Sequence, residues 1–110
     1  MKSQMMIVLV TCGSQEEAKK IANSLIGSRY AACVNIVPGV ESCYVWEGKL
    51  TWDKESLLII KTTKAGLERV RSCIDKEHSY SVPEFIVLKI EDGSDSYLKW
   101  IEASVETNDP

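Results

Sequence analysis

The sequence predicts an α+β domain of the ferredoxin-like, split βαβ class, in the order strand, helix, strand, strand, helix, strand, with an additional C-terminal helix. Two observations support this prediction. Apolar residues change from strand-like runs to helical spacing and back as the chain proceeds. The two central strands also form a hairpin with arms of about fourteen residues, whereas an average strand has about five or six. We expect one domain, residues 1–110, from which part of this hairpin overhangs.

The first strand and the first helix are predicted over residues 5–27. The apolar run Met-Met-Ile-Val-Leu-Val at 5–10, extended to Cys12, has the length of a strand buried on both faces. Ser14 followed by Glu17 fits a capping box. Apolar residues at positions 18, 21, 22, 25 and 26 then follow helical spacing up to Gly27. These patterns predict a helix directly after the first strand.

Residues 31–63 are predicted to form the long antiparallel hairpin. Both arms are rich in β-branched, aromatic and leucine residues, and Gly48 lies in the turn between them. Pro38-Gly39 interrupts the first arm, where a bulge or bend is the usual accommodation. At about 3.3 Å per residue each arm would reach roughly 46 Å, against about 20 Å for a small sheet. Residues 40–53 should therefore project beyond the domain.

The second half of the chain repeats the alternation. Apolar spacing predicts a helix after Thr63, its expected N-cap, that ends near residues 77–78. A turn at 79–83 leads to a final strand at 84–90, and a last helix begins after Ser94. Right-handed crossovers then bring the loop after the first strand, the hairpin tip and the loop before the last strand to one end of the sheet.

Composition and sequence patterns argue against several classes of function. Thirteen basic against sixteen acidic side chains give a net charge of −3, which disfavours a nucleic-acid partner. No apolar run approaches a membrane span, and no signal-peptide pattern is present, so we expect no membrane partner and a cytoplasmic location. Four cysteines, at 12, 33, 43 and 73, include no C-x-x-C pair and are expected to be free thiols.

Three residues are candidate metal ligands. His78, the only histidine, follows Glu77 where the second helix should end, and the topology places Cys12 at the same end of the sheet. Thiolate and imidazole suit copper or zinc, so these three residues predict an incomplete, weak site for a divalent cation that water or a second subunit would complete. A structural alternative is that His78 interacts with the helix dipole.

Two further interpretations of this end of the sheet are weaker. Cys12 and His78 could act as nucleophile and base, but no third orienting residue is evident. Gly13-Ser14 lacks the repeated glycines and the lysine of a phosphate-binding loop, and no organic cofactor is expected.

Aromatic residues gather near the hairpin tip. Tyr44, Trp46 and Trp52 would lie in water in a monomer, although burying one ring removes about 150 to 250 Å² of surface, worth on the order of 4 to 6 kcal/mol before association costs. We therefore expect a neighbouring subunit to cover them together with Val40. A base-stacking surface is the alternative, but acidic residues outnumber basic ones around these rings.

Four segments, at 31–39, 44–49, 58–63 and 80–84, closely resemble the CutA family of divalent-cation tolerance proteins, in the same order and over nearly the whole chain. The resemblance implies a tight homotrimer of ferredoxin-like subunits whose long hairpin arms pair with their neighbours. It also implies a link to copper and other divalent cations, and an architecture like that of the trimeric PII signalling proteins.

The chain departs from the family pattern at two places. The usual His-Pro-Tyr before the last strand is here His78-Ser79-Tyr80, and some members have two successive histidines where this chain has Glu77-His78. Copper-linked members can carry a cysteine at the position of Val10, whereas this chain has Cys12. Only His78 therefore matches a ligand implied by the resemblance.

Two hypotheses of function follow. The first is a non-catalytic homotrimer that binds copper or another divalent cation weakly near the loops of strands one and four and acts in metal tolerance. The second is a PII-like sensor or adaptor whose inter-subunit clefts, near Cys12, Lys49 and Tyr80, bind a small ligand or a partner protein. A copper chaperone would need two cysteines in the first loop, where only Cys12 is present.

Overall fold

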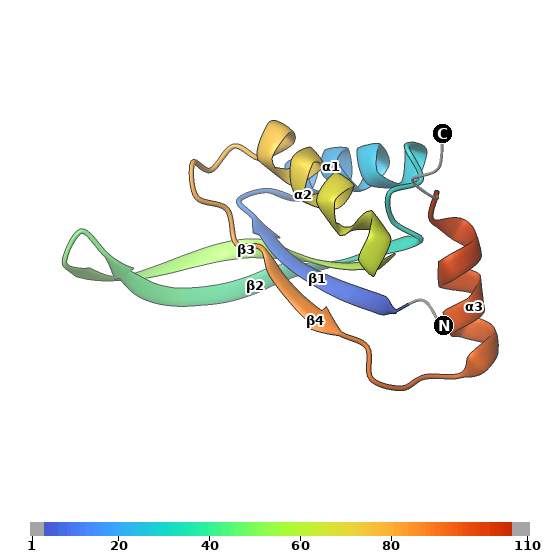
Figure 1. The fold of residues 1–110 in the computed structure, drawn as a ribbon. Helices are drawn as coiled ribbons and strands as arrows, with labels where there is room; N and C mark the ends of the chain where they lie inside the picture. Colours follow the sequence, from blue (N-terminus) through green and yellow to red (C-terminus); the bar gives the residue numbers. More distant parts are fainter. Residues whose placement is uncertain (1–3, 107–110) are drawn as a thin grey trace.

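The computed structural model describes residues 4–106, which form one four-stranded antiparallel sheet and three α-helices (Figure 1). The strand order is β2-β3-β1-β4. This arrangement confirms the predicted ferredoxin-like, split βαβ fold with an extra C-terminal helix. In chain order the elements are β1 (Met5–Cys12), α1 (Gln15–Gly27), β2 (Cys33–Trp46), β3 (Lys49–Thr63), the 3-10 turn η1 (Lys64–Gly66), α2 (Leu67–Glu77), β4 (Ile86–Lys89) and α3 (Asp95–Ser104).

Helices α1 and α2 lie on the same face of the sheet, and α3 lies at one end of it (Figure 1). Exposure along β1 alternates, because α1 and α2 cover only one of its faces. The prediction of a strand buried on both faces is therefore wrong for this single chain. The main core is built from fully buried aliphatic side chains of β1, β3, α1 and α2, among them Val8, Val10, Ile21, Leu25, Leu58, Ile60, Val70 and Ile74.

The long hairpin overhangs as expected. β2 has 14 residues and β3 has 15, and the described fold measures 48 × 28 × 21 Å along its principal axes. β3 pairs with β1 only from Ser56 to Thr63, so its earlier residues have β2 as their only neighbouring strand among the described residues. Figure 1 shows this two-stranded arm projecting from the domain.

The local features of the hairpin follow from backbone conformation. Glu47 and Gly48 form its turn with φ values of 49° and 79°, the left-handed geometry that matches the twist of two-residue hairpins. The register shifts between Val37 and Val40, where Gly39 has φ of 71°. This shift is the bulge predicted at Pro38-Gly39.

Two boundaries differ from expectation. β4 is shorter than the predicted 84–90, because β1 pairs with it only from Met6 to Leu9 and the chain before β4 is held by side chains instead. The hydroxyl of Thr63 accepts a hydrogen bond from the Gly66 N–H, so Thr63 caps η1 and α2 begins three residues later than its predicted cap suggested. Within residues 4–106 no helix is long and apolar enough to cross a membrane.

Candidate functional site

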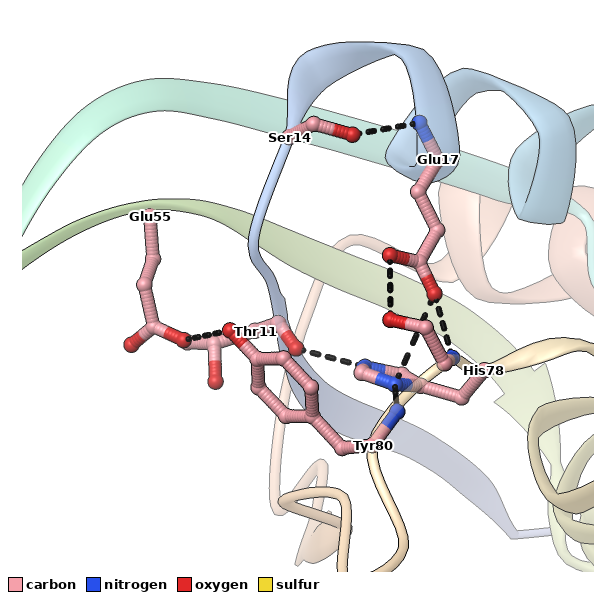
Figure 2. A network of polar contacts seen from close by, with 7 residues as sticks. Thr11, Ser14, Glu17, Glu55, His78 and Tyr80 are labelled. Atoms are coloured by element: carbon pink, nitrogen blue, oxygen red, sulfur yellow. Dashed lines mark hydrogen bonds and ion pairs between the residues drawn. The ribbon is translucent and has the colours of Figure 1, made fainter.

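The sequence-predicted site lies where β1 ends and the segment after α2 crosses it. His78 is the residue directly after α2, and none of its side chain is exposed. Its Nε2 lies 2.7 Å from the Thr11 carbonyl oxygen, and its Nδ1 lies 3.1 Å from the backbone nitrogen of Tyr80 (Figure 2). Because a carbonyl only accepts and a backbone N–H only donates, Nε2 is the donor and Nδ1 the acceptor in these two contacts. Both ring nitrogens are thus engaged in joining β1 to the loop.

Glu17 connects α1 to the same loop. Its backbone N–H donates to the Ser14 hydroxyl, as the capping box predicts. Its carboxylate, however, accepts hydrogen bonds from the Ser79 backbone N–H at 2.6 Å and from the Ser79 hydroxyl at 2.9 Å. The carboxylate also lies 3.6 Å from Nδ1 of His78 (Figure 2). The capping glutamate therefore serves a long-range contact in place of a local one.

Two tyrosine–carboxylate pairs extend the network to the hairpin. The Tyr80 hydroxyl donates to Glu55 at 2.9 Å, and the Tyr44 hydroxyl donates to Asp53. The hydrogen bond to Asp53 is the main reason that the pKa of Tyr44 is raised. Burial, followed by the hydrogen bond to Glu55, raises the pKa of Tyr80. Burial and then the charge of Glu55 raise the pKa of Glu84.

A groove of about 690 Å³ opens beside these pairs, between the hairpin and the loop before β4. Tyr80, one of the residues predicted for a ligand cleft between subunits, lines it. Lys49 and Cys12 do not line it; Lys49 lies opposite Trp46 next to the turn, and Cys12 is fully buried in the core. The lining residues are Tyr44, Trp46, Thr51, Asp53, Tyr80, Ser81 and Val82.

Comparison with known proteins identifies the family. The family described as "CutA1 divalent ion tolerance protein" matches residues 6–104. The chain belongs to the CutA1 divalent ion tolerance family. "Protein CutA, chloroplastic" of Arabidopsis thaliana is 51% identical over 89% of this chain, and "Divalent-cation tolerance protein CutA" of Thermus thermophilus is 43% identical over 86%.

Solved CutA1 structures have the same fold. That of Oryza sativa superposes with a TM-score of 0.91 at 45% identity and covers 94% of each chain. The match spans 54% of the Arabidopsis relative but 92% of the Thermus relative, so the chain covers about half the length of the plant proteins. The CutA1 family thus accounts for the fold over nearly all of this chain.

The family name implies a divalent cation, but the predicted ligands Cys12, Glu77 and His78 are not arranged as a metal site. Burial, with the charges of Glu17 and Glu55, raises the pKa of Cys12 to about 12, which disfavours the metal-binding thiolate. The Glu77 carboxylate accepts a hydrogen bond from Ser24 at 2.8 Å, and both nitrogens of His78 are engaged. Within residues 4–106, no three histidine, cysteine, aspartate or glutamate side chains form a group that could hold a metal ion.

The same contacts argue against the nucleophile–base interpretation. The high pKa keeps Cys12 protonated, and the imidazole of His78 has no free nitrogen to accept its proton. All four cysteines are free, and Cys43 is exposed. The sequence-predicted pair is therefore better described as part of the core and of a structural clasp.

The residues predicted for a subunit interface lie on two faces of the arm. In the hairpin register Val40 is opposite Glu55 and Tyr44 is opposite Thr51, whereas Trp52 is opposite Cys43. Because side chains alternate along a strand, Val40, Tyr44 and Trp46 share one face and Trp52 lies on the other. Trp46 and Trp52 are 62% and 63% exposed in the single chain. Their contact with another subunit stays a prediction.

Sequence reasoning missed the carboxylates of this site. Period-two alternation would have placed Asp53 and Glu55 on the same face of the arm as Tyr44. No local pattern predicts the contact between Glu17 and Ser79, because 62 residues separate them. Ser79 stands where the resemblance implies proline, and it supplies a backbone N–H that proline lacks.

Proposed function

We propose that this chain acts in the cytoplasm as a non-catalytic homotrimer in divalent-cation tolerance, with copper as the foremost cation. Membership of the family supports the role in cation tolerance, and the resemblance to CutA proteins supports an assembly of three subunits. The main structural support for a homotrimer is the apolar surface of the overhanging arm. Val45, Leu50 and Trp52 lie on one face of it and are 69%, 71% and 63% exposed in the single chain. Contiguous apolar surface of this kind marks a protein interface.

The edges of the sheet support the same proposal. β2 and β4 are the two outer strands, and all four residues of β4 are exposed. Ile86 and Leu88 are each 47% exposed on β4, which is an outer strand of the sheet. Exposed apolar edge strands are aggregation-prone unless another strand or subunit covers them.

Light scattering of the purified protein tests the assembly. We expect the mass of a trimer for the wild type and a smaller species for Trp52→Glu, which places a charge on the apolar face of the arm. Lys19→Glu, on an exposed position of α1, is the matched control and should remain trimeric. A monomeric wild type at micromolar concentration would refute the proposal.

Copper binding is the finer part of the proposal. Cys12, Glu77 and His78 would have to give up the contacts described above, so binding through them is weak. Calorimetry with Cu²⁺ and with Zn²⁺ on wild type and on His78→Gln tests this site. Equal heats for both proteins would rule out His78 as a ligand. Cys43→Ser is the matched control. The exposed thiol of Cys43 can bind copper by itself, and this variant measures that contribution to the heat.

The groove favours a second candidate function, a PII-like sensor or adaptor that binds a small ligand. Its volume of about 690 Å³ is within the range of small-molecule sites, and aromatic and polar side chains line it. A ligand that binds the folded protein raises its melting temperature in a concentration-dependent way. A response to small molecules without a response to metal would favour this function over the first.

A further inference from the structure

We propose that the groove between the hairpin arm and residues 80–82 binds an organic ammonium ion, that is, a protonated amine on an apolar body. The inference rests on the second candidate function and names its ligand class. Of residues 4–106, three aromatic side chains and one carboxylate line the groove, and no lysine or arginine does so. This combination selects a cation with apolar surface over an anion or a neutral molecule.

The aromatic lining provides the first part of the argument. Tyr44 and Trp46 contribute rings from β2, and Tyr80 contributes one from the loop. Tyrosine and tryptophan faces attract an ammonium group, and they do so more strongly where water is excluded. Val82, 86% exposed, adds apolar surface for the body of the ligand.

Charge provides the second part. Within the described part of the chain Asp53 accepts one hydrogen bond, from Tyr44, although a carboxylate has about four acceptor positions. Glu55 adjoins the groove through Tyr80, and Ser42 donates to its other oxygen at 2.8 Å. Lys49 lies opposite Trp46 next to the turn and is not part of the lining. A surface with acidic groups and no lining cation attracts cations and repels anions.

The same contacts disfavour a bare metal ion. Each of the two carboxylates is already oriented by a tyrosine hydroxyl, and residues 4–106 contain no cluster of three metal-ligating side chains. A small divalent cation needs several oxygen ligands at short range, whereas an ammonium ion on a carbon chain can use ring faces together with one carboxylate.

Nuclear magnetic resonance of the intact ¹⁵N-labelled protein tests the proposal, with the indole N–H of Trp46 as the reporter. The probes are n-butylammonium, neutral n-butanol and anionic butyrate, which share one apolar body. Asp53→Asn removes the lining carboxylate but keeps an acceptor for Tyr44. Glu41→Gln is the matched control, since it removes one carboxylate from the opposite face of the same arm, where Glu41 pairs with Lys54.

We expect a saturable shift with n-butylammonium alone. Asp53→Asn should weaken this binding by about tenfold, the loss typical of one charge-assisted contact, and Glu41→Gln should change it less than about twofold. Trp46→Leu should weaken it by about two- to tenfold, the loss of one cation–π contact, as followed on the Tyr80 amide. Equal effects of Asp53→Asn and Glu41→Gln would overturn the proposal, because binding would then follow net charge.

The failure of this inference is distinguishable from failure of the sensor function. If n-butanol or butyrate saturates the Trp46 signal as well as n-butylammonium does, the groove binds small molecules but the ammonium assignment is refuted. If none of the three probes shifts Trp46 in the native assembly, the ammonium assignment is also refuted, and a neighbouring subunit becomes the better occupant of the groove.

Discussion

Individual side chains next to the end of β1 stabilise the fold through hydrogen bonds between distant segments. His78 uses both ring nitrogens on backbone groups of two different segments, and Glu17 adds two hydrogen bonds to Ser79. A buried polar group that loses its partner costs about 1 to 3 kcal/mol, so this clasp stabilises the loop before β4 substantially. That loop supplies Tyr80, which links the clasp to the hairpin through Glu55.

Replacing Glu17 by alanine should therefore destabilise the protein more than replacing Glu16. Both residues lie in the first turn of α1 and interact favourably with the helix dipole, but only Glu17 reaches Ser79. We expect Glu17→Ala to lower the free energy of unfolding by about 1 to 3 kcal/mol, and Glu16→Ala by about 0.3 to 1 kcal/mol. Urea denaturation measures both, and equal losses would show that the contacts with Ser79 contribute nothing.

Titration of Cys12 makes the free energy of unfolding depend on pH in the alkaline range. Burial, with Glu17 and Glu55, raises its pKa from 9.0 to about 12 in the folded chain. Well below pH 9.0 the Cys12 thiol is protonated in both the folded and the unfolded chain, so its titration does not affect stability. Above it the unfolded chain loses the proton first, so stability falls as pH rises toward 12, by at most about 1.4 kcal/mol per pH unit.

Cys12→Ala removes this titration and tests its contribution. The variant should lose less stability than the wild type between about pH 8 and about pH 10.5, as measured by urea midpoints at each pH. Burial and Glu77 raise the pKa of Cys73 to about 11, so Cys73 lowers the stability of both proteins at alkaline pH. The test therefore compares how steeply the stability of each protein falls with pH. Parallel pH profiles would contradict the assignment to Cys12.

At the scale of elements, the hairpin is shaped by two short breaks in regular pairing. The bulge at Pro38-Gly39 shifts the register, and the turn at Glu47-Gly48 closes the arm with two left-handed residues. The bulge also shifts which residues of β2 share a face. As a result Tyr44 and Trp46 face the same side as Asp53, and the aromatic–acidic groove is formed on that side.

Gly48→Ala should destabilise the hairpin, and Gly27→Ala should not. An added Cβ would meet no atom within 4 Å at either position, so the two differ only in backbone conformation. Gly48 has φ of 79°, where an L-residue with a Cβ costs about 1 to 2 kcal/mol. Gly27 ends α1 without a positive φ, and alanine there should stabilise by up to about 1 kcal/mol. Thermal unfolding distinguishes the two, and equal shifts would contradict a conformational cause.

The whole molecule has more apolar surface than its own helices cover. α1 and α2 occupy one face of the sheet, while the arm and β4 expose large apolar side chains. A single chain of this shape keeps its apolar arm in water. Assembly is therefore the property on which the other functional statements depend.

Assembly predicts a melting temperature that depends on protein concentration. Because association stabilises only the folded subunits, the wild type should melt at a higher temperature when its concentration is raised about a hundredfold. Trp52→Glu should remove most of this dependence, and Lys19→Glu should keep it. Differential scanning calorimetry gives all three values, and a wild type insensitive to concentration would contradict a dissociating oligomer.

The sequence by itself determined the order and type of the elements, the bulge at Pro38-Gly39 and the overhang of the hairpin, because each depends on local periodicity, turn residues or strand length. It also brought Cys12 and His78 to one end of the sheet through topology alone. Only the tertiary structure decided what these residues do. Burial keeps the Cys12 thiol protonated, and hydrogen bonds to Thr11 and Tyr80 occupy the imidazole. Such partners come from segments far apart in the chain, which no local pattern specifies.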